Sequence, residues 1–394
     1  MVERQERLPA RETVDEVAPG IARIQLPIMI PGLGHVNCYV LEDDRGVTLI
    51  DPGMPDPTTN KVLVQRLASI GVPPERVHTV LVTHSHPDHF GGAGRLKVEH
   101  RCDVVAHRSF HTPFDPRDPF DPNADEMAVL EAASDLISDA DAPDAIGDGS
   151  DTRSGSGSGT SGRRNERLAD VLFGTGEIPD IAPQETPWGE DGFRPGPGEL
   201  EAMRAWDDLS KQGLLQLDPT IRVDDLQILT MGRREWQVIH TPGHTGDHIC
   251  LLDPADGTFL SGDHVLPSIT PHISGMTGSA DSLAEFVAAL QRVASIPEIT
   301  RVLPAHGLPF DDLGGRVDDI IGHHVERLAE IERLGAELGD ATVRTYSRRL
   351  FQERSWGPMA ESETYAHLVH LRVEGRMASR TDDDGLLRFR PRPL

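Results

Sequence analysis

A histidine-rich run at residues 84–89 constrains the fold most tightly. It contains His84, His86, Asp88 and His89 and directly follows an apolar, strand-like stretch. In an extended loop residues i and i+2 point to the same side, so the first two histidines can bind one metal ion while the last two groups turn toward a second. Imidazole and carboxylate are ligands for Zn²⁺, and Fe or Mn also accept them. Taken alone, the run could instead be a solvated turn.

Four further segments share this pattern, because each apolar stretch ends in an acidic or imidazole group. The segments LIDPG, HTPGH, LSGD and LPAH contain Asp51, His244, Asp263 and His306. Strand ends lie along one edge of a sheet, where groups up to 255 residues apart (306 − 51) can converge. The five segments together predict a metal site and weigh against a solvated turn.

Short strand patterns and helical patterns alternate on both sides of residues 111–220, which predicts an α/β fold. The sequence DDRG predicts a hairpin turn at 43–46, and a helix is expected at about 59–70, capped by Thr58 or Thr59. We expect a turn at the glycine cluster 91–94. A helix at 282–296, capped by Ser279 or Asp281, precedes the last apolar strand pattern.

Residues 111–220 form an acidic insertion. They hold 24 acidic and 8 basic residues, a net charge of −16 out of −26 for the chain, and include the linker-like run SGSGSGTSG. Low apolar content cannot offset the entropy lost on ordering, so we expect disorder at 120–165. Helical spacing returns at 198–214, which is a candidate lid or flank for the site.

Residues 311–394 are helical and end in a hairpin pattern with DDDG at its turn, which favours a winged-helix-like domain. Its arginines form the one notably basic cluster: Arg372, Arg376, Arg380, Arg388, Arg390 and Arg392. Nucleic-acid contact is one interpretation. Three aspartates at 382–384 oppose it, and a substrate-pocket wall or a homodimer surface is favoured.

The net charge of −26 argues against general attraction to nucleic acid or anionic membranes, since both are polyanions. The three cysteines are far apart and lack CxxC spacing, which fits a reduced cytoplasm. The charged N-terminal segment lacks a signal-peptide core, and no stretch of 18 apolar residues occurs. We therefore expect a cytoplasmic protein with no membrane segment.

The five segments, in this order, resemble the metallo-β-lactamase superfamily, an αββα sandwich with metals at one edge of its two sheets. The resemblance covers about residues 1–110 and 221–310. It implies a catalytic domain at 1–310, interrupted by the insertion 111–220, and a separate domain at 311–394. It also implies two divalent metal ions, one held by His84, His86 and His244, the other by Asp88, His89 and His306, with Asp263 as the bridge and Asp51 as an outer-shell residue that orients ligands.

Differences among subfamilies narrow the implied chemistry. A β-lactamase of the commonest subclass carries cysteine at the position of Asp263, and a flavodiiron oxygen reductase carries glutamate at that of His86. The carboxylate bridge instead resembles glyoxalase II, where metal-bound hydroxide attacks the substrate. Asp88 is the candidate to orient that water and move its proton.

The loop after Asp263 and the C-terminal region look like the LACTB2-type branch, which includes acyl-carrier-protein thioesterases and single-strand endoribonucleases. We therefore expect a hydrolase of a thioester or ester, with a small-molecule or carrier-bound acyl substrate. Metal-dependent RNA cleavage is the second interpretation. A non-catalytic winged-helix binding protein with a structural metal site is the third.

Further histidines could also act at the site. We favour His248 as support for a ligand, with a catalytic contact to substrate as the alternative. Substrate contact is also conceivable for His264 and His272, on the loop after Asp263. His323 and His324 lie on a charged helix and are expected to be packing or surface groups.

Overall fold

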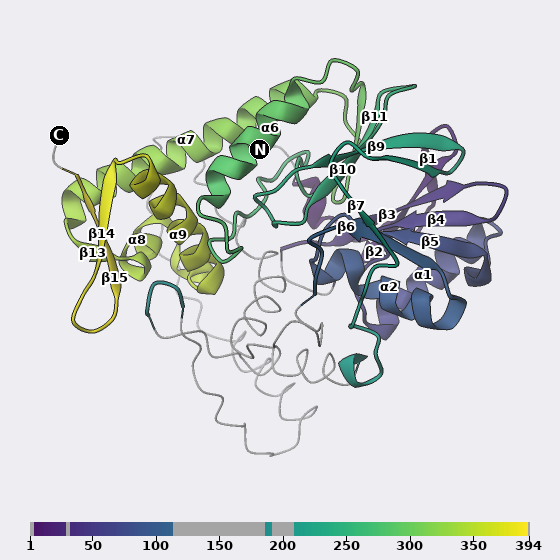
Figure 1. Ribbon diagram of the computed structural model, residues 1–394, viewed down its shortest axis with the longest axis horizontal. Helices are drawn as coiled ribbons and strands as arrows, with labels where there is room; N and C mark the ends of the chain where they lie inside the picture. The colour runs from purple at the N-terminus through teal and green to yellow at the C-terminus, as the bar shows by residue number, and fades with distance from the viewer. Residues whose placement is uncertain (1–3, 29–31, 113–185, 191–208, 393–394) are drawn as a thin grey trace, which may run out of the picture.

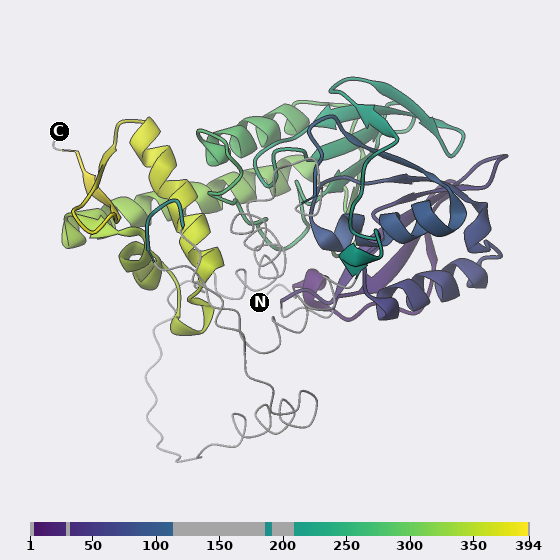
Figure 2. The same cartoon turned by 60° about the horizontal axis from the view of Figure 1, so that its bottom comes forward.

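The computed structural model describes residues 4–28, 32–112, 186–190 and 209–392. Two sheets pack face to face, as Figures 1 and 2 show. The first sheet has the order β1 to β7: β1 (Asp15–Ala18), β2 (Ile21–Pro27), β3 (His35–Glu42), β4 (Val47–Ile50), β5 (Val77–Leu81), β6 (Asp103–His107) and β7 (Ile221–Val223). It is antiparallel up to β4 and parallel from β4 to β7.

The second sheet has the order β12-β11-β10-β9-β8. Its strands are β8 (Ile228–Met231), β9 (Arg234–His240), β10 (Ile249–Asp253), β11 (Thr258–Gly262) and β12 (Arg301–Pro304). Neighbours pair antiparallel except β11 and β12, which are joined through a helix and pair parallel.

Alternating apolar side chains give each sheet two buried faces. In β10, Ile249 and Leu251 face the other sheet, while Cys250 and Leu252 belong to the core beneath the helices. Helices α1 (Pro57–Ser69) and α2 (Pro87–His100) cover the first sheet, and α6 (Ser282–Ala294) and α7 (Leu313–Leu338) cover the second. This confirms the αββα architecture.

The C-terminal region packs onto this layer through the long helix α7, which runs from the sandwich toward the last hairpin (Figure 1). It contains β13 (Ala341–Thr342), α8 (Val343–Leu350), α9 (Pro358–Val373), β14 (Met377–Thr381) and β15 (Leu387–Pro391), with β15 central in a small sheet. The core cluster of the second sheet continues into this region. The domain boundary at 310/311 and the winged-helix-like assignment stay predictions.

Short 3-10 helices complete the fold at Gln5–Arg7, Pro74–Arg76 and Glu353–Ser355. The three cysteines are buried and unpaired. None of the helices in the described part of the chain has both the length and the apolar composition to cross a membrane. A cytoplasmic location stays a prediction.

Within the insertion the structure describes residues 111–112, 186–190 and 209–220. The expected disorder at 120–165 lies outside the described residues, as does 198–208 of the expected helix; a short helical turn is present at 209–211. The low apolar content of the insertion gave no indication that Trp188 would be buried. Its side chain is fully buried, and its Nε1 donates a hydrogen bond to Glu361 at 3.3 Å. This part of the insertion packs against the C-terminal region.

Two local predictions were wrong. The first helix begins at Pro57 and its N-cap is Asp56, whose carboxylate accepts from the backbone N–H groups of Thr58 and Thr59 at 2.8 and 3.0 Å. Asp is a strong N-cap and Pro favours the first helical position, so this start prevails over a threonine cap. For the helix α6, the sequence offered Ser279 or Asp281 as the N-cap, and the structure has Asp281.

The glycine cluster 91–94 lies inside α2 rather than in a turn. Its glycines let the helix approach neighbouring backbone: a Cβ on Gly92 would lie 2.5 Å from the Pro52 carbonyl oxygen, and one on Gly94 would lie 1.8 Å from that of Leu214. Close packing, rather than chain reversal, explains these residues.

We predict that Gly94→Ala destabilises the protein by roughly 2–3 kcal/mol, because the added methyl group overlaps the Leu214 backbone. Gly322→Ala in α7 is the matched control, because a Cβ there meets nothing within 4 Å. The control should be neutral or stabilising by up to about 1 kcal/mol. Thermal unfolding of both variants measures the effect, and equal melting temperatures would refute the packing explanation.

Candidate metal centre

All seven predicted ligands, and Asp51, meet at one edge of the sandwich. Each follows a strand: Asp51 follows β4, His84 and His86 follow β5, His244 follows β9, Asp263 follows β11, and His306 follows β12. His86 is the N-cap of α2, and Asp88 and His89 lie in its first turn, so the helix rather than an extended loop turns them away from His84. Two groups of ligand atoms result.

The first group is His84, His86 and His244, with Asp263 beside them. His86 Nδ1 lies 3.0 Å from His84 Nε2 and 3.1 Å from His244 Nε2. Three imidazole nitrogens around a tetrahedral Zn²⁺ ion lie about 3.3 Å apart, given metal–nitrogen bonds near 2.0–2.1 Å. The spacing therefore fits one metal ion.

Hydrogen bonds on the outer side of the rings settle which nitrogens can bind a metal. His244 Nδ1 donates to the carbonyl of His272 at 2.8 Å, which leaves an Nε2 lone pair facing the group. Thr83 donates its only hydroxyl hydrogen to Asp51, so His84 Nδ1 must donate to Thr83 Oγ1 and also presents Nε2 inward. His86 Nδ1 carries at most one hydrogen, so it cannot donate to the Nε2 lone pairs of both His84 and His244. A cation satisfies all three nitrogens.

The second group is Asp88, His89 and His306. Asp88 Oδ2 lies 3.4 Å from His89 Nε2 and 3.5 Å from His306 Nε2. Here too each Nδ1 donates outward, from His306 to the His35 carbonyl at 2.7 Å and from His89 to Asp51 at 2.9 Å. The inward atoms of all three residues are buried without a hydrogen-bond partner. Such atoms are costly unless a metal ion binds them.

Asp263 lies between the two groups. Its Oδ1 is 3.3 Å from His306 Nε2, while its Oδ2 is 3.5 Å from His89 Nε2 and 3.7 Å from His244 Nε2. Oδ1 therefore lies beside the second group, and Oδ2 lies within 3.7 Å of a ligand atom from each group. This geometry is what a bridging ligand requires.

The electrostatics differ between the two groups of predicted ligands. Burial and the neighbouring imidazoles hold the pKa of His84 and His86 well below the ordinary value, so both are neutral. Burial would raise the pKa of Asp263, but His306 and His89 outweigh it and lower that pKa. The carboxylate is therefore ionised and can bind a cation. Burial would lower the pKa of His89 and His306, but the neighbouring carboxylates outweigh it and raise both, so metal binding in the second group must displace protons.

Asp51, expected to orient ligands, and His248, expected to support a ligand or contact substrate, lie behind the predicted ligands. Asp51 has a left-handed backbone (φ 56°), and its carboxylate accepts from the Thr83 N–H, the Thr83 hydroxyl and His89. His248 is fully buried, and its Nε2 accepts from the backbone N–H of Asp263 at 3.0 Å. The glycine before Asp263 leaves room for this ring. Both side chains therefore contact predicted ligands from the side away from the centre, where they can hold them in position.

The other histidines that the sequence singled out lie behind the centre or in the helical layer. His264 packs edge-on against Phe286, and the His272 ring lies 3.5 Å from Glu363. His324 packs against Phe286 and lies 3.1 Å from His367, which confirms it as a packing group, while His323 beside it is half-buried.

Two supporting groups escaped sequence reasoning. Thr83 links Asp51 to His84, and Asp247 accepts from the Ser85 hydroxyl at 3.1 Å. Burial raises the pKa of Asp247 despite the hydrogen bond from Ser85. Its position between two histidines, in HTGDH, was the available signal.

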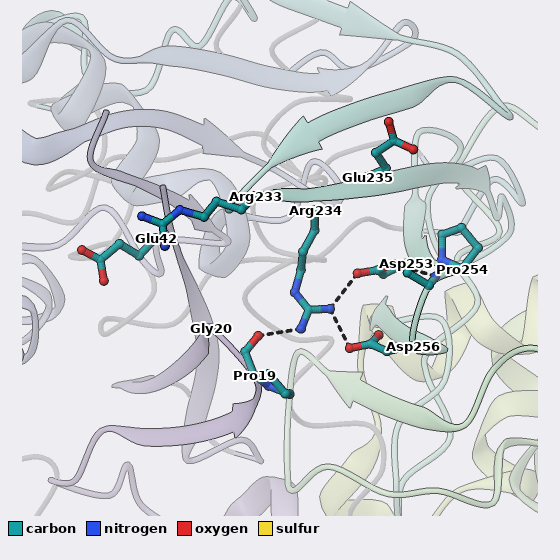
Figure 3. A pocket seen from close by; sticks show the side chains of 11 residues that line it. Pro19, Gly20, Glu42, Arg233, Arg234, Glu235, Asp253, Pro254 and Asp256 are labelled. Carbon is teal, nitrogen blue, oxygen red and sulfur yellow. Dashed lines mark hydrogen bonds and ion pairs between the residues drawn. The ribbon is translucent and has the colours of Figure 1, made fainter. Parts of the chain in front are cut away.

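A cavity of about 590 Å³ lies at the opposite end of the strands, at the β1–β2, β8–β9 and β10–β11 turns (Figure 3). Its Arg234 is bound by Asp253 at 2.6 Å, Asp256 at 2.8 Å and the Pro19 carbonyl at 2.5 Å. Because the chain's own groups bind the Arg234 guanidinium, we interpret these contacts as structural. The cavity is separate from the metal centre.

We predict that Asp51→Asn weakens metal binding by about 10–100-fold, because an amide NH₂ cannot accept the hydrogen bonds from both Thr83 and His89. Asp43→Asn is the matched control: Asp43 also contacts a histidine, His78 at 3.1 Å, but in the distant β3–β4 turn. Competition with a chromophoric zinc chelator measures both affinities. Equal affinities in the two variants would show that Asp51 does not support the site.

Comparison with known proteins identifies the family to which a site of this geometry belongs. Residues 31–337 match the metallo-beta-lactamase superfamily. The chain is similar to a beta-lactamase-like protein 2 homolog of Drosophila melanogaster, 28% identical over 161 residues, or 39% of this chain and 52% of that protein. An atrochrysone carboxyl ACP thioesterase of Cryptosporiopsis sp. (strain 8999) is 27% identical over 109 residues, covering 28% of this chain and 31% of that protein.

The chain thus spans about half or less of these curated relatives. A crystal structure of a metallo-beta-lactamase family protein from Thermus thermophilus shares the fold, with a TM-score of 0.65 at 22% identity over 96% of this chain and 100% of that one. Since the superfamily match covers most of the chain and the predicted ligands converge within it, the protein belongs to the metallo-beta-lactamase superfamily.

Proposed function

We propose that the protein is a metal-dependent hydrolase of carboxylic thioesters or esters, with a small-molecule or carrier-bound acyl substrate. The observation that carries this proposal is the paired set of inward-facing ligand atoms with Asp263 between them. We infer two divalent ions, zinc by preference and Fe or Mn as alternatives. When bound, such a pair activates water and stabilises developing oxyanion charge.

The chain's own residues hold and orient the reacting groups. Asp88 is buried, and its Oδ2 faces the centre. The same carboxylate can accept a proton from water and pass it to a leaving group. Asp51 and His248 keep His89 and the Asp263 backbone in place, so the geometry does not have to reorganise during the reaction.

The charge distribution supports an acyl substrate over RNA. In the C-terminal cluster Arg376 binds Glu332 and Glu374, Arg380 binds Asp340, and Arg388 binds Asp382. Arginines engaged by the chain's own carboxylates offer little to a phosphate backbone. A relative named as an acyl-carrier-protein thioesterase supports the same choice.

We predict turnover on a panel of acyl-thioesters and esters by the zinc- or manganese-loaded protein. His86→Ala should lower it at least about 100-fold, because a ligand is lost. His78→Ala, which removes a histidine outside the centre, should leave turnover unchanged. Steady-state assays, with single-stranded RNA cleavage at about 0.15 M salt measured in parallel, make the test.

Metal-dependent RNA cleavage that His86→Ala removes, with no thioesterase or esterase activity, would replace the proposal by phosphodiester hydrolysis. No turnover on any substrate despite bound metal would favour the non-catalytic binding protein.

A further inference from the structure

The loop between Asp263 and α6 connects the metal centre to the C-terminal region. His272 on this loop accepts the hydrogen bond that fixes His244, through its main-chain carbonyl. A carbonyl can orient an imidazole only if its own position is fixed. What anchors His272 therefore matters for the first metal position.

The His272 ring is anchored by Glu363, on α9. Its Nδ1 lies 3.5 Å from Glu363 Oε2, and both side chains are buried. A buried carboxylate is unfavourable without a nearby partner, and the His272 ring is one of the groups that lie against this one. Burial would raise the pKa of Glu363, but the neighbouring His272 ring and the charge of Arg327 outweigh it and lower that pKa.

Neighbouring contacts hold the same stretch of loop against α9. The backbone N–H of Gly275 donates to Ser362 Oγ at 3.1 Å, and Ser282 donates to the Ser274 carbonyl at 2.8 Å. A Cβ on Gly275 would lie 2.6 Å from the Tyr365 ring and 2.9 Å from the Ser362 carbonyl oxygen. Only glycine permits this approach, so loop and helix are closely fitted.

We propose that Glu363 is a positioning residue of the metal centre: it holds the His272 ring, and thereby the carbonyl that orients His244. The C-terminal region then completes the centre, although it supplies none of the seven ligands. This inference rests on the metal centre underlying the proposed function, but not on the choice of substrate.

The test is zinc affinity of the full chain, measured by competition with a chromophoric chelator. Glu363→Gln keeps the side-chain size and removes the charge that holds His272; we expect about tenfold weaker zinc binding, the lower end of outer-shell effects. Glu361→Gln is the matched control on the same helix. It removes an ion pair with the partly exposed Arg344 at 2.8 Å that does not reach the loop, so zinc affinity should stay unchanged.

Melting temperatures of both variants separate positioning from stability, since both lose a buried carboxylate charge on the same helix. His272→Asn provides a second route, because it removes the ring but keeps the carbonyl, and the double variant with Glu363→Gln should be no weaker than either single one. Unchanged zinc affinity in Glu363→Gln or in His272→Asn, or an equal loss in Glu361→Gln, would overturn the inference. Absence of thioesterase activity would affect only the proposed function, because zinc binding needs no substrate.

Discussion

Inward-facing lone pairs and carboxylate oxygens, buried together at one sheet edge, are the constraint on which the structure depends. His84, His244, His89 and His306 each direct Nδ1 outward to a fixed acceptor and Nε2 inward. Burying such acceptors without donors costs roughly 1–3 kcal/mol each. Bound divalent cations would remove this free-energy cost. The arrangement that is unfavourable without metal is therefore the one that favours metal binding.

The fold meets this constraint by fixing the loops that carry the ligands. The loop after Asp263 is held at several points: Glu6 accepts from the Ser268 and Ile269 backbone N–H groups at 2.8 and 3.2 Å, and Arg316 on α7 donates to the Leu266 and Ile269 carbonyls. Segments far apart in the sequence thus stabilise one short stretch. Rigid support of this kind is what a preorganised site needs.

The α/β class and the residues of the metal site could be predicted because both depend on local patterns, whereas the αββα architecture was implied by the family resemblance. An apolar strand pattern that ends in His or Asp marks the edge of a sheet. This signal was enough to name all seven residues whose ligand atoms the structure brings into two groups. The predictions of an extended loop at 84–89 and of a turn at the glycine cluster were wrong. Pro87 begins a helix, and Gly94 lets that helix pack against the distant Leu214 backbone. Thr83, Asp247 and the buried Trp188 act through tertiary contacts, which no local pattern reports.

The central claim is that the two groups of ligand atoms bind two metal ions with Asp263 between them. Anomalous diffraction at the zinc edge from crystals of the zinc-loaded chain tests it most directly. We expect two peaks roughly 3.5–4 Å apart, as in other two-metal sites, with Asp263 contacting both. A single peak at His84, His86 and His244, with Asp88, His89 and His306 not bound to metal, would contradict the account.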